Sequence, residues 1–395
     1  MAKKVPATKA KVKKAEAKKA PTKSSGIVES TRRYETWLRA QLGADLVEKD
    51  LEAKHEKMRQ NAFSFFRATY YRWAEVVPKL CPVLVEGPRV LAVGDIHLEN
   101  FGVWRDADGR LVWGVNDYDE AAKMPYALDL ARLAVSAVLA PGPAQADIDK
   151  LCGMIVDGYE AGLEKPSAFV LDRDNTWLSE QFRVDAGERA AFWTKIQRQL
   201  EKARDKPVKP PPPYVAVLDA AMPAPIRKLT YWHRGAGTGS LGRPRWVAYG
   251  MWQDGPVLRE AKAALPSAWS LANRDTKQRI RIQEAAQGRY RAPDPFYRVS
   301  SVRGAKNHIL ARRLSPNSRK LETEQHGAVL LDPRMLQAMG RDLAAIHLGT
   351  PPGATLADAL RGSCDTLSRA LPEAVRTAAK HFREEYTAWR YGAAA

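Results

Sequence analysis

RVLAVGDIHLENFGVWRDADGRLVWGVNDYDE, residues 89–120, is the most informative stretch of this chain. It begins with a short apolar run that ends at Gly94, and two further apolar runs, FGVW and LVWGV, flank Asp108-Gly109. An Asp-Gly pair between two strand-like runs is a strong signal for a β-hairpin. The stretch therefore predicts a strand, a polar loop at 94–100 and a hairpin that returns the chain to Asn116.

That hairpin would bring two polar segments together. Asp95 is followed five positions later by Asn100, a spacing that lets both side chains reach one point at the end of the strand. The Asp can accept a proton from a hydroxyl group, and the Asn carbonyl can bind Mg²⁺. Asp117 and Asp119 follow the hairpin and add carboxylates, which are hard oxygen ligands suited to magnesium. Each segment alone could instead be a capped turn or a solvated loop.

Helical patterns flank this stretch. Apolar residues recur at helical spacing over 30–80 and 126–165, and a charged amphipathic pattern covers about 187–205. Asp129 lies on the apolar side of the second pattern, which indicates a buried carboxylate that accepts hydrogen bonds from backbone amides. The alternative is an ordinary first-turn Asp that is stabilised by the helix dipole.

A proline-rich stretch divides the chain. Prolines at 207 and 210–213 favour an extended linker over residues 207–224. Behind it the sequence predicts a mixed pattern: strands around a glycine-rich turn and around Asp254-Gly255, a helix over 275–290, strands at FYRVSSV and HILARRL, and helices over 333–347 and about 366–390.

The glycine-rich turn is the second motif with chemical meaning. Residues 235–242 read GAGTGSLG, and glycines let backbone N–H groups approach phosphate oxygens without a Cβ clash. A strand-like run follows the loop, which argues against a Rossmann turn, and the loop lacks the Gly-Lys-Ser/Thr of a P-loop. A loop folded over phosphates between antiparallel strands is the arrangement of protein kinases. The candidate phosphate-binding residues are Gly235, Gly237, Gly239, Ser240 and Gly242.

A cation on the following strand is expected to reach the same phosphates. Alternation along VLREAKAA places Lys262 on one face and Arg259 on the other, and we prefer Lys262 while Arg259 stays open. Glu284, in the helical pattern QRIRIQEAAQ, is the natural ion-pair partner of that cation. A solvated edge lysine and a surface glutamate are the alternatives.

These motifs resemble the protein-kinase-like superfamily. VGDIHLENFGVW, GVNDYDEA and YALDLARL are similar to the catalytic loop, metal loop and following helix of aminoglycoside phosphotransferases. Residues 55–350 resemble more closely a bacterial family known as domain of unknown function number 2252. The resemblance implies the following roles: Asp95 as the catalytic Asp, Asn100 and Asp117 as metal ligands with Asp119 as a further candidate, Lys262 as the strand Lys and Glu284 as the helix Glu.

The order of the motifs departs from that of an ordinary kinase. The catalytic-type loop at 94–100 precedes the glycine-rich loop, and MGRDLAAIH (339–347), which resembles the helix that leads into such a loop, lies near the C-terminus. The metal loop also reads Asn-Asp-Tyr where kinases have Asp-Phe-Gly. The resemblance implies a circularly permuted, two-lobed α+β fold. Its predicted parts are a helical lobe (27–206), a linker (207–224), a strand-rich nucleotide lobe (225–315) and C-terminal helices (316–395) that pack on the helical lobe.

Composition and net charge indicate which classes of molecule the protein could bind. The chain has 395 residues, 45% of them hydrophobic, and a net charge of +18. Residues 1–26 hold nine lysines, one glutamate and no aromatic residue, so they supply +8 and are expected to be a disordered basic tail. The remaining +10 favours anionic partners. The tail would either bind nucleic acid non-specifically or serve as a solubilising extension.

Other features limit the protein class. Three widely spaced cysteines form no disulfide framework and no zinc motif, and no apolar stretch approaches the roughly 20 residues needed to span a bilayer. The N-terminus lacks the apolar region of a secretory signal. We therefore expect a cytoplasmic protein without membrane contact.

The sequence favours an ATP·Mg²⁺-dependent phosphotransferase that acts on a small-molecule or protein hydroxyl. Nucleotidyl transfer and an inactive pseudokinase on the same scaffold are alternatives. GDIHLEN also resembles the opening Asp-x-His of metallophosphoesterases, although the chain has only seven histidines. A non-catalytic nucleic-acid-associated protein that uses the basic tail is the remaining alternative.

Overall fold

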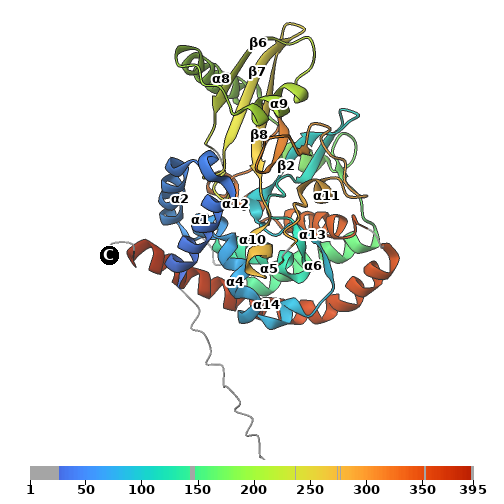
Figure 1. Ribbon diagram of the computed structural model, residues 1–395. Coiled ribbons are helices and arrows are strands. Elements are labelled where there is room, and N and C mark those ends of the chain that lie inside the picture. The colour runs from blue at the N-terminus through green and yellow to red at the C-terminus, as the bar shows by residue number, and fades with distance from the viewer. Residues whose placement is uncertain are drawn as a thin grey trace, which may run out of the picture.

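The computed structural model describes residues 26–142, 147–235, 237–273, 275, 277–350 and 353–392, which form a mixed α+β structure (Figure 1). Apart from Gly26, the predicted basic tail lies outside the described residues. In Figure 1 the largest sheet lies at the top and the long helices lie at the bottom. None of the helices in the described ranges is long and apolar enough to cross a membrane.

The N-terminal segment is helical, as its apolar spacing predicts. Its helices are α1 (Ile27–Leu42), α2 (Glu48–Gln60), α3 (Ala62–Ala68) and α4 (Tyr70–Leu80). Short 3₁₀ helices lie at Gly43–Asp45, Pro82–Val85 and Leu98–Asn100. The aromatic residues of the pattern, among them Phe63, Phe66 and Trp73, are buried in the main core.

The predicted strand and hairpin are present. Strand β1 (Arg89–Ala92) pairs antiparallel with β4 (Ala122–Pro125), while β2 (Phe101–Arg105) pairs with β3 (Leu111–Val115) and β5 (Phe169–Val170) extends β3. The register sets Phe101 opposite Val115, and the Asn116 N–H donates to the Asn100 carbonyl at 3.2 Å. The hairpin therefore brings the acidic segment back beside the polar loop.

Long helices form the base of the molecule. They are α5 (Ala127–Leu139), α6 (Ile148–Glu164), α13 (Pro333–His347) and α14 (Gly353–Gly392), and α14 runs along the bottom of Figure 1. Helices α6 and α13 cross with their backbones almost in contact. A Cβ at Gly158 would lie 2.0 Å from the Gln337 carbonyl oxygen, and one at Gly340 would lie 2.1 Å from the Ile155 carbonyl oxygen.

A five-stranded antiparallel sheet forms the other end. Its order is β6 (Arg227–His233), β7 (Arg245–Trp252), β8 (Gly255–Ala264), β10 (His308–Leu314) and β9 (Arg298–Ser300). Helix α8 (Ala186–Asp205) packs Leu200 and Ala203 against Val247 and Leu258, on one face of the sheet. Helix α8 is thus part of the sheet's core, although the sequence analysis grouped it with the N-terminal helices.

The proline-rich stretch is not an extended linker throughout. Residues Pro212–Ala221 form helix α9, whose Tyr214, Val217 and Leu218 pack against Ala248, Ala261 and Ile309 of the sheet. Proline fits the first turn of a helix because the N–H groups of that turn have no intrahelical partner. The apolar face behind the prolines therefore outweighs their tendency to remain extended.

Further helices complete the chain: α7 (Thr176–Gln181), α10 (Ala268–Ala272), α11 (Ile282–Ala286) and α12 (Thr323–Leu330). The helix predicted over 275–290 is shorter in the structure, where α11 covers only Ile282–Ala286; Gln278, ahead of it, has a φ of 37°, which a right-handed helix does not accommodate. The helix predicted at about 366–390 belongs to the longer α14.

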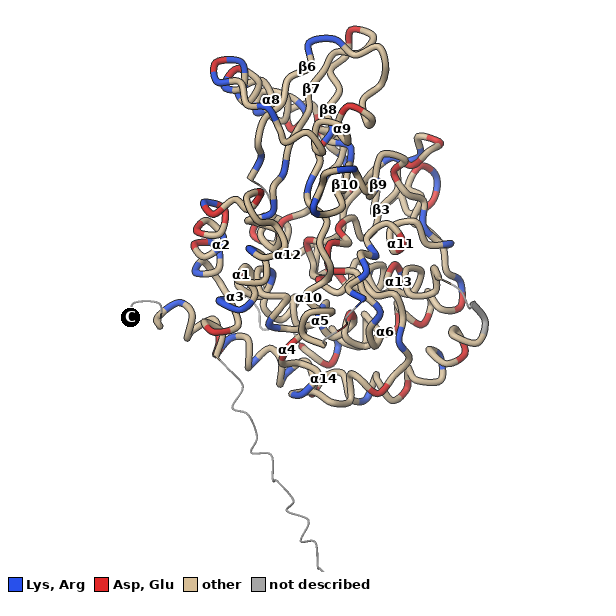
Figure 2. Tube along the Cα trace, viewed as in Figure 1, with Lys and Arg blue, Asp and Glu red and all other residues tan. Residues whose placement is uncertain are grey.

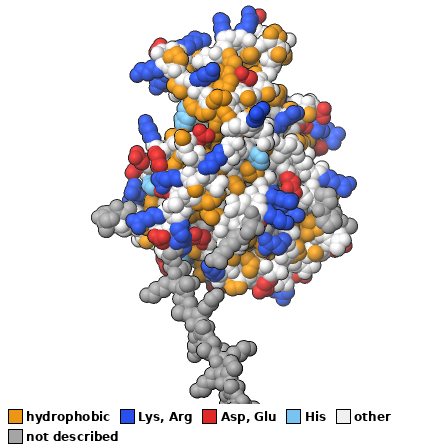
Figure 3. Space-filling model, in the orientation of Figure 1, with side chains coloured by type: hydrophobic (Ala, Val, Ile, Leu, Met, Phe, Trp, Pro, Cys, Tyr) orange, Lys and Arg blue, Asp and Glu red, His pale blue; other side chains and the backbone are white. Residues whose placement is uncertain are grey.

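Charged residues are unevenly placed. Acidic and basic positions lie close together where the sheet approaches the helices (Figure 2), whereas both signs are interspersed with apolar side chains over the face in Figure 3. The interior group of charges marks the candidate site.

Candidate functional site

A pocket gathers residues from both predicted motifs. Asp95, Asn100, Asp117 and Asp119 line it together with residues 237–240 of the glycine-rich loop. It holds about 680 Å³ of space without protein atoms, part of it open to solvent. Because the two groups come from distant parts of the chain, the fold brings together what the sequence proposed separately.

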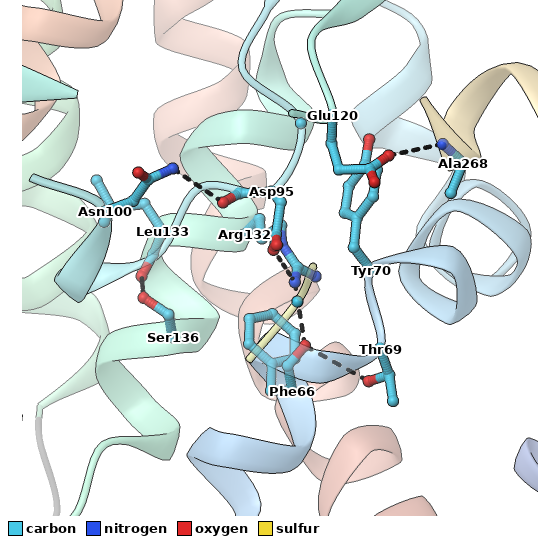
Figure 4. A network of polar contacts seen from close by, with 12 residues as sticks. Phe66, Thr69, Tyr70, Asp95, Asn100, Glu120, Arg132, Leu133, Ser136 and Ala268 are labelled. Atoms are coloured by element: carbon cyan, nitrogen blue, oxygen red, sulfur yellow. Dashed lines mark hydrogen bonds and ion pairs between the residues drawn. The ribbon is translucent and has the colours of Figure 1, made fainter. Parts of the chain in front are cut away.

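One carboxylate oxygen of Asp95 is hydrogen-bonded, and the other faces the glycine-rich loop. Arg132, fully buried on α5, donates from Nη2 and Nε to Oδ1 of Asp95 at 2.6 and 3.2 Å (Figure 4). A Cβ at position 239 would lie 3.1 Å from Oδ2. Burial raises the pKa of Asp95, and the Arg132 guanidinium partly offsets that rise.

Hydrogen bonds to a buried carboxylate fix the backbone of the two residues that precede Asp95. Asp129 is fully buried and accepts hydrogen bonds from the N–H groups of Val93 and Gly94 at 2.7 and 2.9 Å. His347, at the end of α13, lies with Nε2 3.2 Å from the same carboxylate. The prediction of a buried carboxylate bonded to backbone amides is confirmed, and these bonds hold the strand end that positions Asp95.

Asn100 ties the two polar segments together. Its Nδ2 donates to the carbonyl oxygens of Asp95 and Asp117 at 3.2 and 3.0 Å. Its Oδ1 is buried and has no hydrogen-bond partner among the described residues. Since buried polar atoms are nearly always paired, this oxygen is a candidate ligand for a cation.

Lys262 meets the acidic segment. Its Nζ lies 2.6 Å from Oδ1 of Asp119 and 3.4 Å from Oδ1 of Asp117, and Lys262 is buried. Burial opposes the ionisation of Asp117, but the charges of Lys262 and its basic neighbours outweigh burial and hold the pKa of this carboxyl well below its usual range. Asp117 is therefore an anion at neutral pH, with a third of its side chain exposed.

Arg259 lies on the opposite face of β8. Its Nε donates to the Ala221 carbonyl at 2.9 Å, and its guanidinium stacks 3.9 Å from the Phe296 ring centroid. Of the two candidate cations, Lys262 is therefore the one that reaches the acidic segment.

The predicted pairing of Glu284 with that cation is wrong. Glu284 is 43% exposed and forms an ion pair with Arg281 at 2.6 Å, since the short helix α11 directs it to solvent. The buried glutamate of the sheet is instead Glu260, which pairs with three arginines: Arg234, Arg245 and Arg312.

The predicted loop residues divide into two groups. Gly237, Gly239 and Ser240 line the pocket, whereas Gly235 is exposed beside Asp50 and Gly242, with φ at +92°, packs against Leu51. Of the five predicted loop residues, the three in the middle therefore line the pocket and the two at the ends do not.

The loop is held by residues that the sequence analysis did not single out. Lys54 of α2 donates from Nζ to the Gly239 carbonyl at 3.3 Å, and burial with the nearby Arg243 charge lowers the pKa of Lys54 to about 8. Arg243 donates to Oε1 of Glu120 at 2.8 Å.

Two of the basic residues at the pocket differ in how easily the sequence could have revealed them. Arg132 is the lone arginine in the apolar run LDLARLAV, a pattern that indicates a buried charge, whereas Lys54 is one of many charged residues in its helix.

A model of uncharacterized proteins conserved in bacteria, DUF2252, matches residues 46–209 and 228–391. The chain belongs to the DUF2252 family. The predicted resemblance to that family is confirmed, and both groups of pocket residues lie within the matched stretches. No curated protein and no solved structure matches the chain.

Within the described ranges, no group of three or more His, Cys, Asp and Glu side chains is arranged to hold a metal ion.

Proposed function

We propose that this protein is an ATP·Mg²⁺-dependent phosphotransferase of the kinase-like type that acts on a small-molecule or protein hydroxyl. The observation that carries the proposal is the shared pocket of Asp95, Asn100, Asp117 and the glycine-rich residues 237–240. Phosphoryl transfer requires mainly positioning and charge neutralisation, which such a set provides.

Asp95 would act on the acceptor hydroxyl. Arg132 occupies Oδ1, so Oδ2 is the oxygen left to accept the proton. Burial raises the pKa of Asp95 toward the operating range, which makes the carboxylate a stronger base than an exposed Asp.

The donor set fits magnesium. Magnesium is commonly held by one or two carboxylates, several waters and the phosphates of the substrate. Asn100 Oδ1, which has no partner, and the ionised Asp117 would hold it, with Asp119 as a further candidate. When bound, the ion would neutralise charge on the phosphates.

The fold we propose is a two-lobed kinase-like fold in permuted order. The sheet would carry the nucleotide-binding loop, and the helical base would carry the catalytic loop. Support comes from His347, which ends the helix α13 that resembles the lead-in to a kinase catalytic loop. His347 contacts Asp129, which in turn holds the amides in front of Asp95, although α13 follows that loop in the sequence.

The proposal predicts different defects for Asp95→Asn and Asp117→Ala. Asp95→Asn should lower ATP consumption by roughly 10²–10⁴-fold while ATP·Mg²⁺ affinity stays near wild type, since Asp95 serves the acceptor. Asp117→Ala should lose both. Calorimetry with ATP·Mg²⁺ and mass spectrometry of a metabolite extract incubated with enzyme and ATP measure the two effects.

Glu284→Gln is the matched control, because it removes an exposed carboxylate outside the pocket and should leave both measurements unchanged. Thermal melting of each variant checks the fold. Turnover that persists in Asp95→Asn and Asp117→Ala would refute the assignment.

A further inference from the structure

A second pocket has a lining that adjoins that of the first along the chain. Asn116 lines the second pocket and Asp117, the next residue, lines the first. Arg312 also lines the second pocket and is close enough to Asp117 to lower the pKa of that carboxyl. The two linings therefore meet at residues 116–117.

The second pocket combines flat aromatic and aliphatic surface with four charged residues, Arg291, Asp294, Arg312 and Arg313. Trp104, Tyr118 and Tyr297 contribute aromatic rings, and Val103 and Val115 add aliphatic surface. It contains about 570 Å³ of space without protein atoms, part of it open to solvent. Mostly apolar pockets of several hundred Å³ with a few polar groups are the usual form of small-molecule sites.

Four buried polar atoms of its lining residues have no hydrogen-bond partner among the described residues, and two of them are Nε atoms of Arg291 and Arg313. Asn116 Oδ1 and the Tyr297 hydroxyl are buried and make no hydrogen bond with any described residue. Burial, together with the charges of Asp117 and Asp119, raises the pKa of Tyr297 well above its ordinary value, so the hydroxyl keeps its proton and can donate. The pocket thus offers the Asn116 oxygen as an acceptor and the Tyr297 hydroxyl as a neutral donor beside the two arginines, and a ligand would satisfy them.

We propose that this second pocket binds the adenine base of the nucleotide whose phosphates enter the first pocket, with Asn116 and Tyr297 reading the edge of the base. This inference rests on the proposed function. Adenine presents an amino donor beside ring-nitrogen acceptors, which suits Asn116 Oδ1 and the Tyr297 hydroxyl. Guanine would set its carbonyl oxygen against Asn116 Oδ1, and the aromatic walls suit stacking of a base.

Two tyrosines of the same pocket make a matched test. The Tyr118 hydroxyl already donates to the Val115 carbonyl at 2.9 Å, whereas the Tyr297 hydroxyl has no partner. Tyr297→Phe and Tyr118→Phe each remove one hydroxyl and keep the ring. Of these two variants, Tyr297→Phe should weaken adenine binding and Tyr118→Phe should not. Asn116→Ala, which removes the proposed acceptor, should also weaken it.

The experiment measures Kd by calorimetry for ATP, GTP and inorganic tripolyphosphate, each with Mg²⁺. We expect wild type to prefer ATP, and Tyr297→Phe and Asn116→Ala to weaken ATP binding by roughly 3- to 10-fold, as one lost hydrogen bond predicts. Tripolyphosphate binding should stay unchanged in both variants, and Tyr118→Phe should match wild type throughout.

The outcomes separate the two proposals. If wild type binds ATP but Tyr297→Phe and Asn116→Ala keep its affinity, or lose ATP and tripolyphosphate equally, base reading by this pocket is wrong while the phosphotransferase proposal stands. If wild type binds neither ATP nor tripolyphosphate, the proposed function fails and base reading fails with it. Melting curves exclude unfolding, and Tyr297→Phe, which keeps its ring, remains informative if Asn116→Ala is unstable.

Discussion

At the scale of single residues, the site depends on which polar atoms are satisfied. Arg132 occupies one oxygen of Asp95 and Asn100 donates to two backbone carbonyls, so Asp95 Oδ2 and Asn100 Oδ1 remain for a ligand. An arrangement that served only stability would be expected to pair the buried Asn100 oxygen. Pairing thus distinguishes the atoms that hold the site from those that would do chemistry.

The pH dependence of turnover should follow Asp95. A base must be ionised, so activity falls as pH falls through its pKa. Burial raises that pKa and Arg132 lowers it. Arg132→Gln removes the lowering charge, so the acidic limb of kcat/KM should move to higher pH by roughly 1–3 units.

Arg132→Lys keeps the charge and should move the acidic limb less, which separates charge from general disruption of a buried site. Arg281→Gln, which removes a partly buried arginine that pairs with Glu284 outside the pocket, should leave the profile unchanged. An unshifted limb in a folded Arg132→Gln protein would show that Arg132 does not govern the base.

At the scale of elements, sequence signals were reliable where they were local. The strand before Asp95, the Asp-Gly hairpin and helix α13 follow from patterns within a few residues, and all three are present. These local elements place the candidate residues Asp95, Asn100 and Asp117 in one pocket. Strand alternation is also local, and it correctly predicts that Lys262 and Arg259 lie on opposite faces of β8, with Lys262 toward the acidic segment.

The failures concern tertiary contacts. Helix α9 forms because its apolar face packs on a sheet whose position the local sequence does not reveal. The sequence predicts an ion pair between Glu284 and Lys262, but Glu284 pairs with Arg281 at the surface. The glutamate that pairs with arginines inside the sheet is Glu260. Lys54 reaches Gly239 across nearly two hundred residues, and a single sequence gives no sign of such a contact.

The crossing of α6 and α13 gives a prediction at this scale. Gly158→Ala would force a Cβ to within 2.0 Å of the Gln337 carbonyl oxygen, so the helices must separate. We expect the free energy of unfolding to fall by about 1–3 kcal/mol, as overpacking usually costs. Urea unfolding monitored by circular dichroism measures it.

Gly153→Ala, in the same helix, is the control. No atom lies within 4 Å of a Cβ there, and alanine favours helices, so this variant should gain roughly 0.5–1 kcal/mol. Equal effects of the two substitutions would contradict the close crossing.

At the scale of the whole molecule, both halves of the chain build one pocket. Residues of α2, of the β1–β4 region and of the β6–β7 loop meet there, and α13 supports it from below. The charge of the body is distributed differently from that of the tail. On the face shown in Figure 3, basic side chains alternate with acidic and apolar ones, whereas residues 1–26 concentrate +8 in one segment.

Removal of residues 1–26 should therefore weaken binding to nucleic acid without affecting turnover. Counterion release makes log Kd depend on log salt in proportion to the phosphates neutralised, so both the affinity and the salt slope should fall. At low salt we expect at least a tenfold loss of affinity for a random DNA duplex, measured by fluorescence anisotropy over a salt series.

A full-length variant with the nine tail lysines replaced by glutamine keeps the length and should lose affinity equally. ATP consumption should match wild type in both proteins, because every residue assigned to the pocket lies outside the tail. DNA binding that is unchanged at equal salt would assign adhesion to the +10 of the body instead.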